Sequence, residues 1–313
     1  MDILTNPAIL FFVFGILAGV MKSNLELPQA VAKFLSMYLL MSIGLKGGLA
    51  LSQSGLTIDV LTIMALAIFM AFLVPMISYR FLRLYLNGFD ASAVAATYGS
   101  ISAVTFVTAS QYLTNMGISY DGYMSAAMAL MESPAIIIAV LFSNNMRRNA
   151  DTSVGHILKD SFVEGANLLL LASLAIGVLA GTEGYDLMKP FASDLFSGLL
   201  AFFLLDMGLQ VAKNIPQLKG KSPVLLAYAL IAPLLHASLA LAACLVLGIG
   251  FGNTILMMVL VASASYIAVP AALRHAIPEA SPSLYLGLSL GITFPFNVIL
   301  GIPLYHAMAS YVF

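Results

Sequence analysis

The chain has 313 residues, of which 61% are hydrophobic and only 9% are charged. Soluble domains carry about 25% charged residues, so the composition excludes an ordinary soluble protein and places the chain in a lipid bilayer. The net charge of −1 argues against nucleic acid as a partner. The single cysteine, Cys244, excludes an intrachain disulfide, and the four histidines are too scattered to suggest a metal site.

Ten hydrophobic segments follow one another along the chain, each with roughly the 20 residues that a membrane-spanning helix needs. We therefore predict an all-α polytopic membrane protein with ten transmembrane helices. A signal peptide is an alternative interpretation of the first segment. However, Asp2 precedes it and no basic residue occurs before Lys22, so we interpret it as a retained span. The predicted spans are 7–22, 28–51, 57–82, 90–112, 120–143, 160–181, 191–213, 222–249, 252–275 and 281–311.

Lysine and arginine residues gather in the loops on one side of the predicted helices. The positive-inside rule makes that side cytoplasmic. Because the number of spans is even, we expect both termini outside the cytoplasm of a bacterial plasma (inner) membrane, with the 144–158 loop inside. The residues on the basic side are Lys22, Arg80, Arg83, Arg147, Arg148, Lys159, Lys213, Lys219, Lys221 and Arg274, whereas the opposite side has Lys189.

Short motifs recur in the two halves of the sequence at offsets of 161 to 164 residues. Each match is weak alone, because Gly, Ala and Ser are common in membrane helices, but a nearly constant offset through four of the five span pairs indicates an internal repeat. The clearest pairs are Gly15–Gly19 with Gly177–Gly181, Ile43–Leu45 with Met207–Leu209, and Ser100–Ser102 with Ser263–Ser265.

The predicted repeat contains five spans, so its second copy enters the membrane from the opposite side. Such inverted repeats are typical of secondary transporters, whose sites lie near the midplane where broken helices of the two halves meet. Alternating access follows from this architecture, whereas an enzyme or a receptor has no special need of it. The predicted units are a first repeat at 1–143, a short cytoplasmic linker at 144–158 and a second repeat at 159–313.

Two polar stretches at mid-bilayer depth, 99–105 and 263–266, are the candidate halves of a substrate site. Serines, small residues and the nearby Pro270 loosen a helix and free backbone groups that hydrocarbon cannot satisfy. Freed N–H groups at helix N-termini favour a small anion, whereas hydroxyls and carbonyls suit Na⁺. Alternatively, the small residues only allow close helix packing; we favour the site because the stretches are paired. The predicted anion-binding residues are Gly99, Ser100, Ser102, Thr105, Ser263, Ala264, Ser265 and Tyr266.

Glu132 lies midway along the fifth predicted span, where a charge is costly and usually functional. We interpret it as a carboxylate that couples Na⁺, with Thr293, Asn297 and Ser102 as further oxygen ligands. The alternative is a protonated or ion-paired structural acid. Asp206 and Lys46 also lie deep in spans, and we expect them to form a structural or gating ion pair.

Several motifs in the chain resemble the SbtA-type sodium-dependent bicarbonate transporter family, and the resemblance covers nearly the whole sequence. It implies ten helices in two inverted repeats, a gate domain and a core domain, a homotrimer, and sodium-coupled uptake of an anion. The motifs are Ser263–Arg274, Pro278–Tyr285, Thr293–Asn297 with Gly301–Pro303, and Phe203–Leu209.

The chain departs from the family pattern at two places. Bicarbonate-transporting members have a Ser-Gly-Ser-Thr-like run where this chain has Ser102-Ala-Val-Thr105, and an aspartate where it has Glu132. The central loop at 144–158 is also short compared with the family's, which counts against control by the PII-like regulatory protein that docks there.

These observations together predict a secondary active transporter that imports bicarbonate or another small anion with Na⁺ as the coupling ion and no other cofactor. One alternative is a sodium or proton exchanger that uses Glu132 without an anion substrate. Another is a membrane sensor that binds its ligand without moving it. An enzyme is disfavoured, because no nucleophile–base pair or metal-ligand spacing is present.

Overall fold

The computed structural model describes residues 6–146 and 165–313, and every regular element in these ranges is helical. Two shorter apolar helices, α1 (Pro7–Val20) and α11 (Phe251–Ala262), accompany eight segments that are long and apolar enough to cross a membrane. The predicted class, an all-α polytopic membrane protein, is therefore confirmed, whereas most of the predicted linker falls outside the described residues. The eight long segments are Gln29–Ser54, Ile58–Leu82, Gly88–Asn115, Met124–Ser143, Leu168–Asp194, Phe196–Leu218, Pro223–Val246 and Pro282–Val312.

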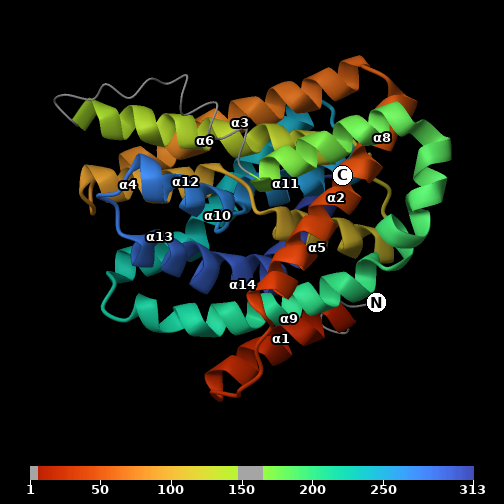
Figure 1. Ribbon diagram of the computed structural model, residues 1–313. Helices are drawn as coiled ribbons and strands as arrows, with labels where there is room; N and C mark the ends of the chain where they lie inside the picture. Colours follow the sequence, from red (N-terminus) through yellow and green to blue (C-terminus); the bar gives the residue numbers. More distant parts are fainter. Residues whose placement is uncertain (1–5, 147–164) are drawn as a thin grey trace.

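Four helices form one unit, which we call the panel. α1 packs along α9 (Phe196–Asn214), and α2 (Gln29–Ser54) packs along α8 (Gly165–Lys189). Contacts between α2 and α9 join the two pairs, and Figure 1 shows α1 and α9 together at one edge of the molecule. α8 changes direction at Gly181, whose φ of 57° is a conformation that glycine adopts without strain.

The other helices form a second unit, which we call the body. Its regular helices are α3 (Ile58–Leu82), α4 (Gly88–Gly99), α5 (Ala103–Asn115), α6 (Met124–Met146), α10 (Pro223–Val246), α11 and α12 (Ala268–Ala276). α3 packs against α4 and α6, and α10 packs against α11, which also contacts α5. The body therefore contains two helices that are interrupted in the middle, α4–α5 and α11–α12.

The last long segment of the body is irregular. Pro295 lies in its middle, where a proline removes a backbone donor and prevents regular α-helical hydrogen bonding. The chain responds with π-helical turns on both sides of a single α-helical turn. In order, the pieces are α13 (Pro282–Leu288), a π turn at Ser289–Thr293, α14 (Phe294–Phe296), a π turn at Asn297–Gly301, and α15 (Ile302–Val312).

Glycines let the panel helices cross at backbone contact. Gly208 meets Gly15 where α9 crosses α1, and Gly48 meets Gly177 where α2 crosses α8. An added Cβ would lie 2.2 Å from a carbonyl oxygen of α1 at Gly208, and 2.1 Å from one of α8 at Gly48. The two crossings therefore make Gly48 the equivalent of Gly208. The repeat in the sequence instead aligns Gly208 with Gly44, one helical turn earlier in α2.

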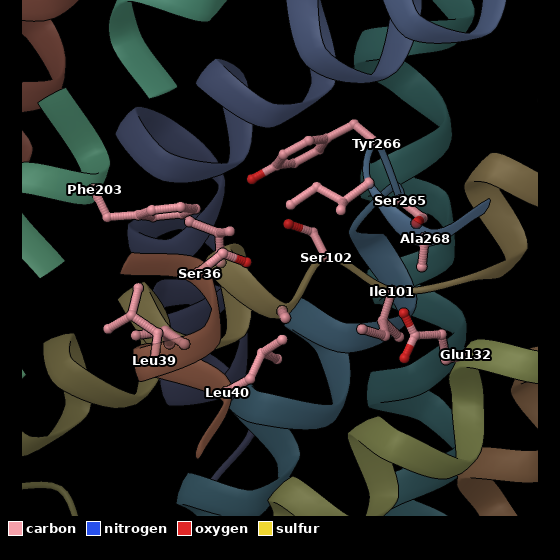
Figure 2. A pocket seen from close by; sticks show the side chains of 14 residues that line it. Ser36, Leu39, Leu40, Ile101, Ser102, Glu132, Phe203, Ser265, Tyr266 and Ala268 are labelled. Carbon is pink, nitrogen blue, oxygen red and sulfur yellow. The ribbon is translucent and has the colours of Figure 1, made fainter. Parts of the chain in front are cut away.

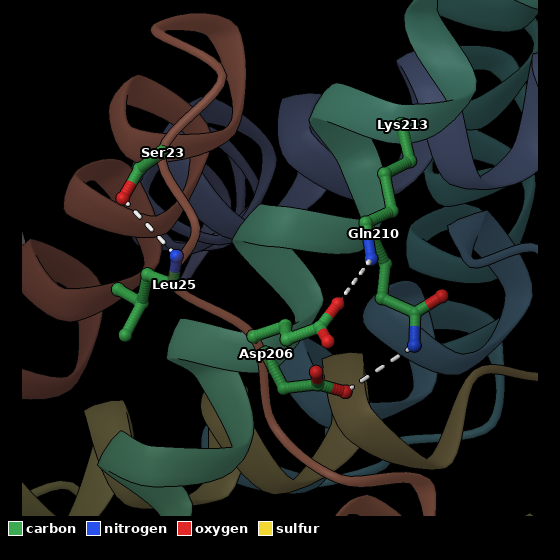
Figure 3. Close-up of polar contacts among 6 residues, drawn as sticks. Ser23, Leu25, Asp206, Gln210 and Lys213 are labelled. Carbon is green, nitrogen blue, oxygen red and sulfur yellow. Dashed lines mark hydrogen bonds and ion pairs between the residues drawn. The ribbon is translucent and has the colours of Figure 1, made fainter.

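The expected ion pair between Asp206 and Lys46 is not formed. Asp206 accepts a hydrogen bond from Gln210 at 3.3 Å, with Lys213 nearby (Figure 3), and the Lys46 ammonium lies 4.4 Å from the centre of the Phe196 ring. The register of the crossings explains this outcome. Both residues lie two positions before their crossing glycine, so they occupy matching places in different helix pairs instead of facing each other.

We expect Gly208→Ala to lower the stability of the purified protein by about 1–3 kcal/mol, the usual cost of overpacking a close contact. The methyl group must push α1 and α9 apart. The measurement is the melting temperature in detergent. Gly198→Ala is the matched control in the same helix, because nothing lies within 4 Å of its added Cβ. Equal melting temperatures for the two variants would contradict the interpretation.

Candidate substrate site

Both predicted helix breaks are present in the body. α4 ends at Gly99 and α5 begins at Ala103, while α11 ends at Ala262 and α12 begins at Ala268. Extended backbone follows each first half, with Ser100 at φ −97° and ψ −179° and Ser263 at φ −80° and ψ 166°. The two interruptions therefore occur at the positions that the Ser-x-Ser repeat predicts.

Local contacts explain why the first helix stops where it does. An added Cβ at Gly99 would lie 2.5 Å from the ring of Pro75, so glycine is needed for α3 to approach the end of α4. The new helix then begins with an N-cap, because the Ser102 hydroxyl accepts from the Thr105 N–H at 3.2 Å. The Thr105 hydroxyl also donates to Ser102 at 2.9 Å.

The two breaks cross and satisfy each other's backbone groups. The Ser102 N–H donates to the Ser263 hydroxyl at 2.9 Å, and the Ser265 N–H donates to the Thr97 carbonyl at 2.8 Å. The Ser263 hydroxyl donates in turn to the Leu260 carbonyl at 2.8 Å. All these groups are buried, so each bond replaces one that water would otherwise provide.

A cavity of about 40 Å³ lies where this crossing meets the panel. A water molecule needs about 10–15 Å³ by such a measure, so the space has room for a few water molecules or a small ion. Figure 2 shows side chains from both units around it. The body contributes Ile101, Ser102, Ala103, Val104, Val107, Glu132, Ser265, Tyr266, Ile267 and Ala268, and the panel contributes Ser36, Leu39, Leu40 and Phe203.

The polar groups divide between two ends of the cavity. In Figure 2 the hydroxyls of Ser36, Ser102 and Tyr266 point into one end, whereas Glu132 and Ser265 lie toward the other. The Tyr266 hydroxyl is buried near Ser102 yet has no hydrogen-bond partner of ordinary geometry among the described residues. A buried hydroxyl without a partner costs free energy, which a bound ligand would recover.

The structure brings three of the eight predicted anion-binding residues to the cavity wall and leaves the other five behind it. Ser102, Ser265 and Tyr266 line the cavity, together with Glu132 from the predicted cation site. The others hold the breaks in place: Gly99 admits Pro75, Thr105 binds Ser102, Ser263 forms the crossing, and the Ser100 hydroxyl donates to the Glu132 carbonyl at 3.4 Å. Ala264 is buried beside them.

Thr293 and Asn297 are not brought to the cavity. Thr293 donates to the Ala229 carbonyl at 2.7 Å and bonds to the Tyr98 hydroxyl at 2.6 Å. Asn297 donates to the Ala262 carbonyl at 3.0 Å and accepts from the Tyr305 hydroxyl. Because Ala262 is the last residue of α11, Asn297 satisfies a carbonyl that the helix break sets free.

Sequence reasoning missed the wall that the panel contributes. Ser36, Leu39 and Leu40 belong to α2, and Phe203 belongs to α9. Phe203 was visible as part of a family-like motif, but Ser36 is one serine in an apolar span and carries no signal of its own. Its role depends on which face of α2 turns toward the body, and the weak periodicity of this helix does not reveal that face.

A cavity beside broken helices that cross, with hydroxyls and a carboxylate around it, is typical of secondary transporters. The chain matches the Na⁺-dependent bicarbonate transporter superfamily over residues 7–310, and it belongs to that superfamily. The predicted family is therefore confirmed. Membership implies Na⁺-dependent bicarbonate transport, no enzymatic activity, and Na⁺ as the coupling ion without a cofactor. No curated protein sequence matches the chain.

We expect Ser263→Ala to destabilise the protein, because it leaves the buried Ser102 N–H without an acceptor. The expected loss is about 1–3 kcal/mol, measured as a lower melting temperature in detergent. Ser92→Ala is the matched control: Ser92 is equally buried, but its hydroxyl bonds to the Gly88 carbonyl of its own helix. An equal shift in melting temperature for both variants would show that the bond between the two breaks stabilises the protein no more than an ordinary hydrogen bond within one helix.

Proposed function

We propose that this protein imports bicarbonate together with Na⁺ by alternating access. The observation that carries the proposal is a small cavity between panel and body, with converging hydroxyls at one end and Glu132 toward the other. A hydrogen-bonding anion and a hard cation fit these two ends. Bound together, the two ions compensate each other's charge in a site that is largely apolar.

The anion is proposed to bind to Ser102 and Tyr266 at one end of the cavity and to extend to Ser265, which lies toward Glu132. Two helices, α5 and α12, begin at residues that line the cavity. The positive ends of their dipoles favour negative charge there. The unpartnered Tyr266 hydroxyl adds a donor, and its ring is supported by Phe294, whose centre lies 4.9 Å away.

Na⁺ is proposed to bind beside Glu132. The Ser102 hydroxyl, toward the other end of the cavity, becomes a second oxygen ligand if it gives up one of the two hydrogen bonds that it accepts from Thr105. The carboxylate is only 8% exposed, and a buried charge of this kind is usually functional in a membrane protein. Thr293 and Asn297 join this ligand set only if they exchange their bonds to the Ala229 and Ala262 carbonyls. In the present conformation we assign them the support of the broken helix.

The ten-span inverted repeat is part of the proposal, and symmetric contacts support it. α1 on α9 and α2 on α8 are equivalent pairs under such a repeat, as are α3 on α4 and α10 on α11. Two hydrogen bonds also occupy equivalent places in the two halves. Asp90 at the start of α4 accepts from the Ser281 N–H at 2.7 Å, and Asn253 at the start of α11 accepts from the Asp121 N–H at 2.9 Å. The panel corresponds to the gate domain of the resemblance and the body to the core domain.

We also propose the bacterial plasma membrane, with termini outside and the basic loops in the cytoplasm. Polar contacts among helix ends and loops place Lys213 and Lys221 on one face, and the positive-inside rule makes such a basic face cytoplasmic. These contacts are Lys213 with Glu26 at 4.0 Å, Lys221 with Ser283 at 3.3 Å, and the Asp90–Ser281 bond. Arg147, Arg148, Lys159 and nearly all of the 144–158 loop, where a PII-like regulator would dock, lie outside the described residues. The homotrimer remains a proposal from the resemblance.

Alternating access is proposed to occur at the boundary between the two units. The cavity wall is shared, with Phe203 and Leu39 on the panel side and Ser102 and Tyr266 on the body side. A sliding of the body along the panel therefore changes the route to the ions without breaking the serine crossing, which lies wholly within the body.

The decisive experiment is uptake of labelled bicarbonate into proteoliposomes at alkaline pH, where little dissolved CO₂ crosses the lipid. We expect uptake to require an inward Na⁺ gradient, and labelled Na⁺ uptake to require bicarbonate. Na⁺ flux driven by a pH gradient alone, without an anion, would support the exchanger instead. Bicarbonate binding without counterflow would support the sensor. Liposomes without protein are the control.

For the cation site, we expect Glu132→Ala to reduce Na⁺-dependent uptake at least tenfold while the protein stays folded. The carboxylate provides the formal charge that attracts Na⁺ into the cavity. Glu132→Asp, the family's residue at this place, should retain measurable Na⁺ dependence. Glu183→Ala, on an exposed part of α8, is the control. Normal Na⁺-driven uptake by Glu132→Ala would contradict the proposed role of Glu132 in Na⁺ coupling.

A further inference from the structure

Ser36 differs from most hydroxyl residues on the helices of this protein. Serines and threonines here commonly donate to the carbonyl one turn earlier, as Ser92, Thr97, Thr108 and Ser289 do at 2.7–2.9 Å. Ser36 forms no hydrogen bond to any described residue, and it lines the cavity. Figure 2 shows its hydroxyl directed into the cavity at the end that Ser102 and Tyr266 share.

Ser36 is also the one polar side chain among the panel residues that line the cavity. Its companions Leu39, Leu40 and Phe203 present hydrocarbon, and Phe203 is only 2% exposed. An anion that touches this wall can therefore receive a hydrogen bond from the panel at Ser36 and at no other described lining residue.

We infer that Ser36 is a direct ligand of the transported anion, so that the bound anion links the panel to the body. The inference rests on the proposed function and extends it to the panel side of the site. Three hydroxyls from three elements, α2 and the two breaks, match the three oxygens of a trigonal oxyanion such as bicarbonate, whose two unprotonated oxygens accept and whose O–H group can also donate. A spherical halide cannot use three such separated donors equally well.

The link also bears on movement of the two units. The Ser102 and Tyr266 hydroxyls move with the body, whereas the Ser36 hydroxyl stays with the panel. Sliding of the body therefore breaks the Ser36 contact and leaves the others intact. Ser36 thus holds the loaded site at the boundary and must release the anion before access can switch.

The test is bicarbonate uptake by Ser36→Ala. We expect the KM for bicarbonate to rise about tenfold, as for loss of one hydrogen bond to a charged group. The Na⁺ concentration for half-maximal rate at saturating bicarbonate should not change. Ser36→Thr should restore most of the affinity. Ser42→Ala is the matched control on the same helix, because Ser42 is fully buried and does not line the cavity.

A second readout is independent of transport. Cys244 is fully buried and is the chain's one cysteine, so Ser36→Cys places a single reactive thiol in the cavity wall. We expect bicarbonate with Na⁺ to slow alkylation of this thiol by a small maleimide at least fivefold. An unchanged KM for Ser36→Ala, or a raised KM without protection of the thiol, would overturn direct contact.

The outcome for Ser36 is separable from that of the proposed function. Ser265→Ala and Tyr266→Phe probe the body side of the same site. If both raise the KM for bicarbonate and Ser36→Ala does not, the body holds the anion alone and the inference about the panel fails. If none of the three variants alters the KM, the site assignment itself fails.

Discussion

The reciprocal hydrogen bonds between the two helix breaks are the interaction on which the rest of this structure depends. An interrupted helix in hydrocarbon leaves several N–H and carbonyl groups without partners, each at a cost of several kcal/mol. Here the Ser102 N–H finds the Ser263 hydroxyl, and the Ser265 N–H finds the Thr97 carbonyl. Because each break completes the other, neither could persist alone at this depth, and the cavity exists where they meet.

The panel and the body solve different packing problems. The panel brings whole helices into backbone contact through Gly48 and Gly208, which favours a stiff unit with few internal cavities. The body instead combines short half-helices with hydrogen-bonded side chains such as Asn297 and Thr293, which hold carbonyls of neighbouring segments. The panel has irregular backbone at Gly181 and at the π turn Pro190–Asp194, whereas both helix breaks that line the cavity belong to the body.

Sequence reasoning reached the class, the family and the helix breaks because these depend on composition and on local residue types. The Ser-x-Ser pair and Glu132 are unusual in apolar spans, so each stands out without knowledge of packing. Thr293 and Asn297 are equally polar, but whether they face the ions or a freed carbonyl is decided by helix rotation. The predicted Asp206–Lys46 ion pair was wrong because the alignment of the two repeats was off by one helical turn. In the observed register the two residues occupy equivalent positions in different helix pairs, so they do not face each other. Ser36 was missed for the same reason as Thr293, since one serine does not reveal which way a helix turns.

The small volume and apolar walls of the cavity have a thermodynamic consequence for the order of binding. Under the proposed assignment, with Glu132 carrying the charge that attracts Na⁺, an anion that entered before Na⁺ would lie close to this carboxylate. Two like charges about 5 Å apart repel by ~3 kcal/mol at an effective dielectric constant of about 20, equivalent to more than a hundredfold in affinity. In the proposed site, Na⁺ at the carboxylate would remove that repulsion, so the cation would enter first and the anion would follow. The same repulsion would oppose entry of the anion without Na⁺.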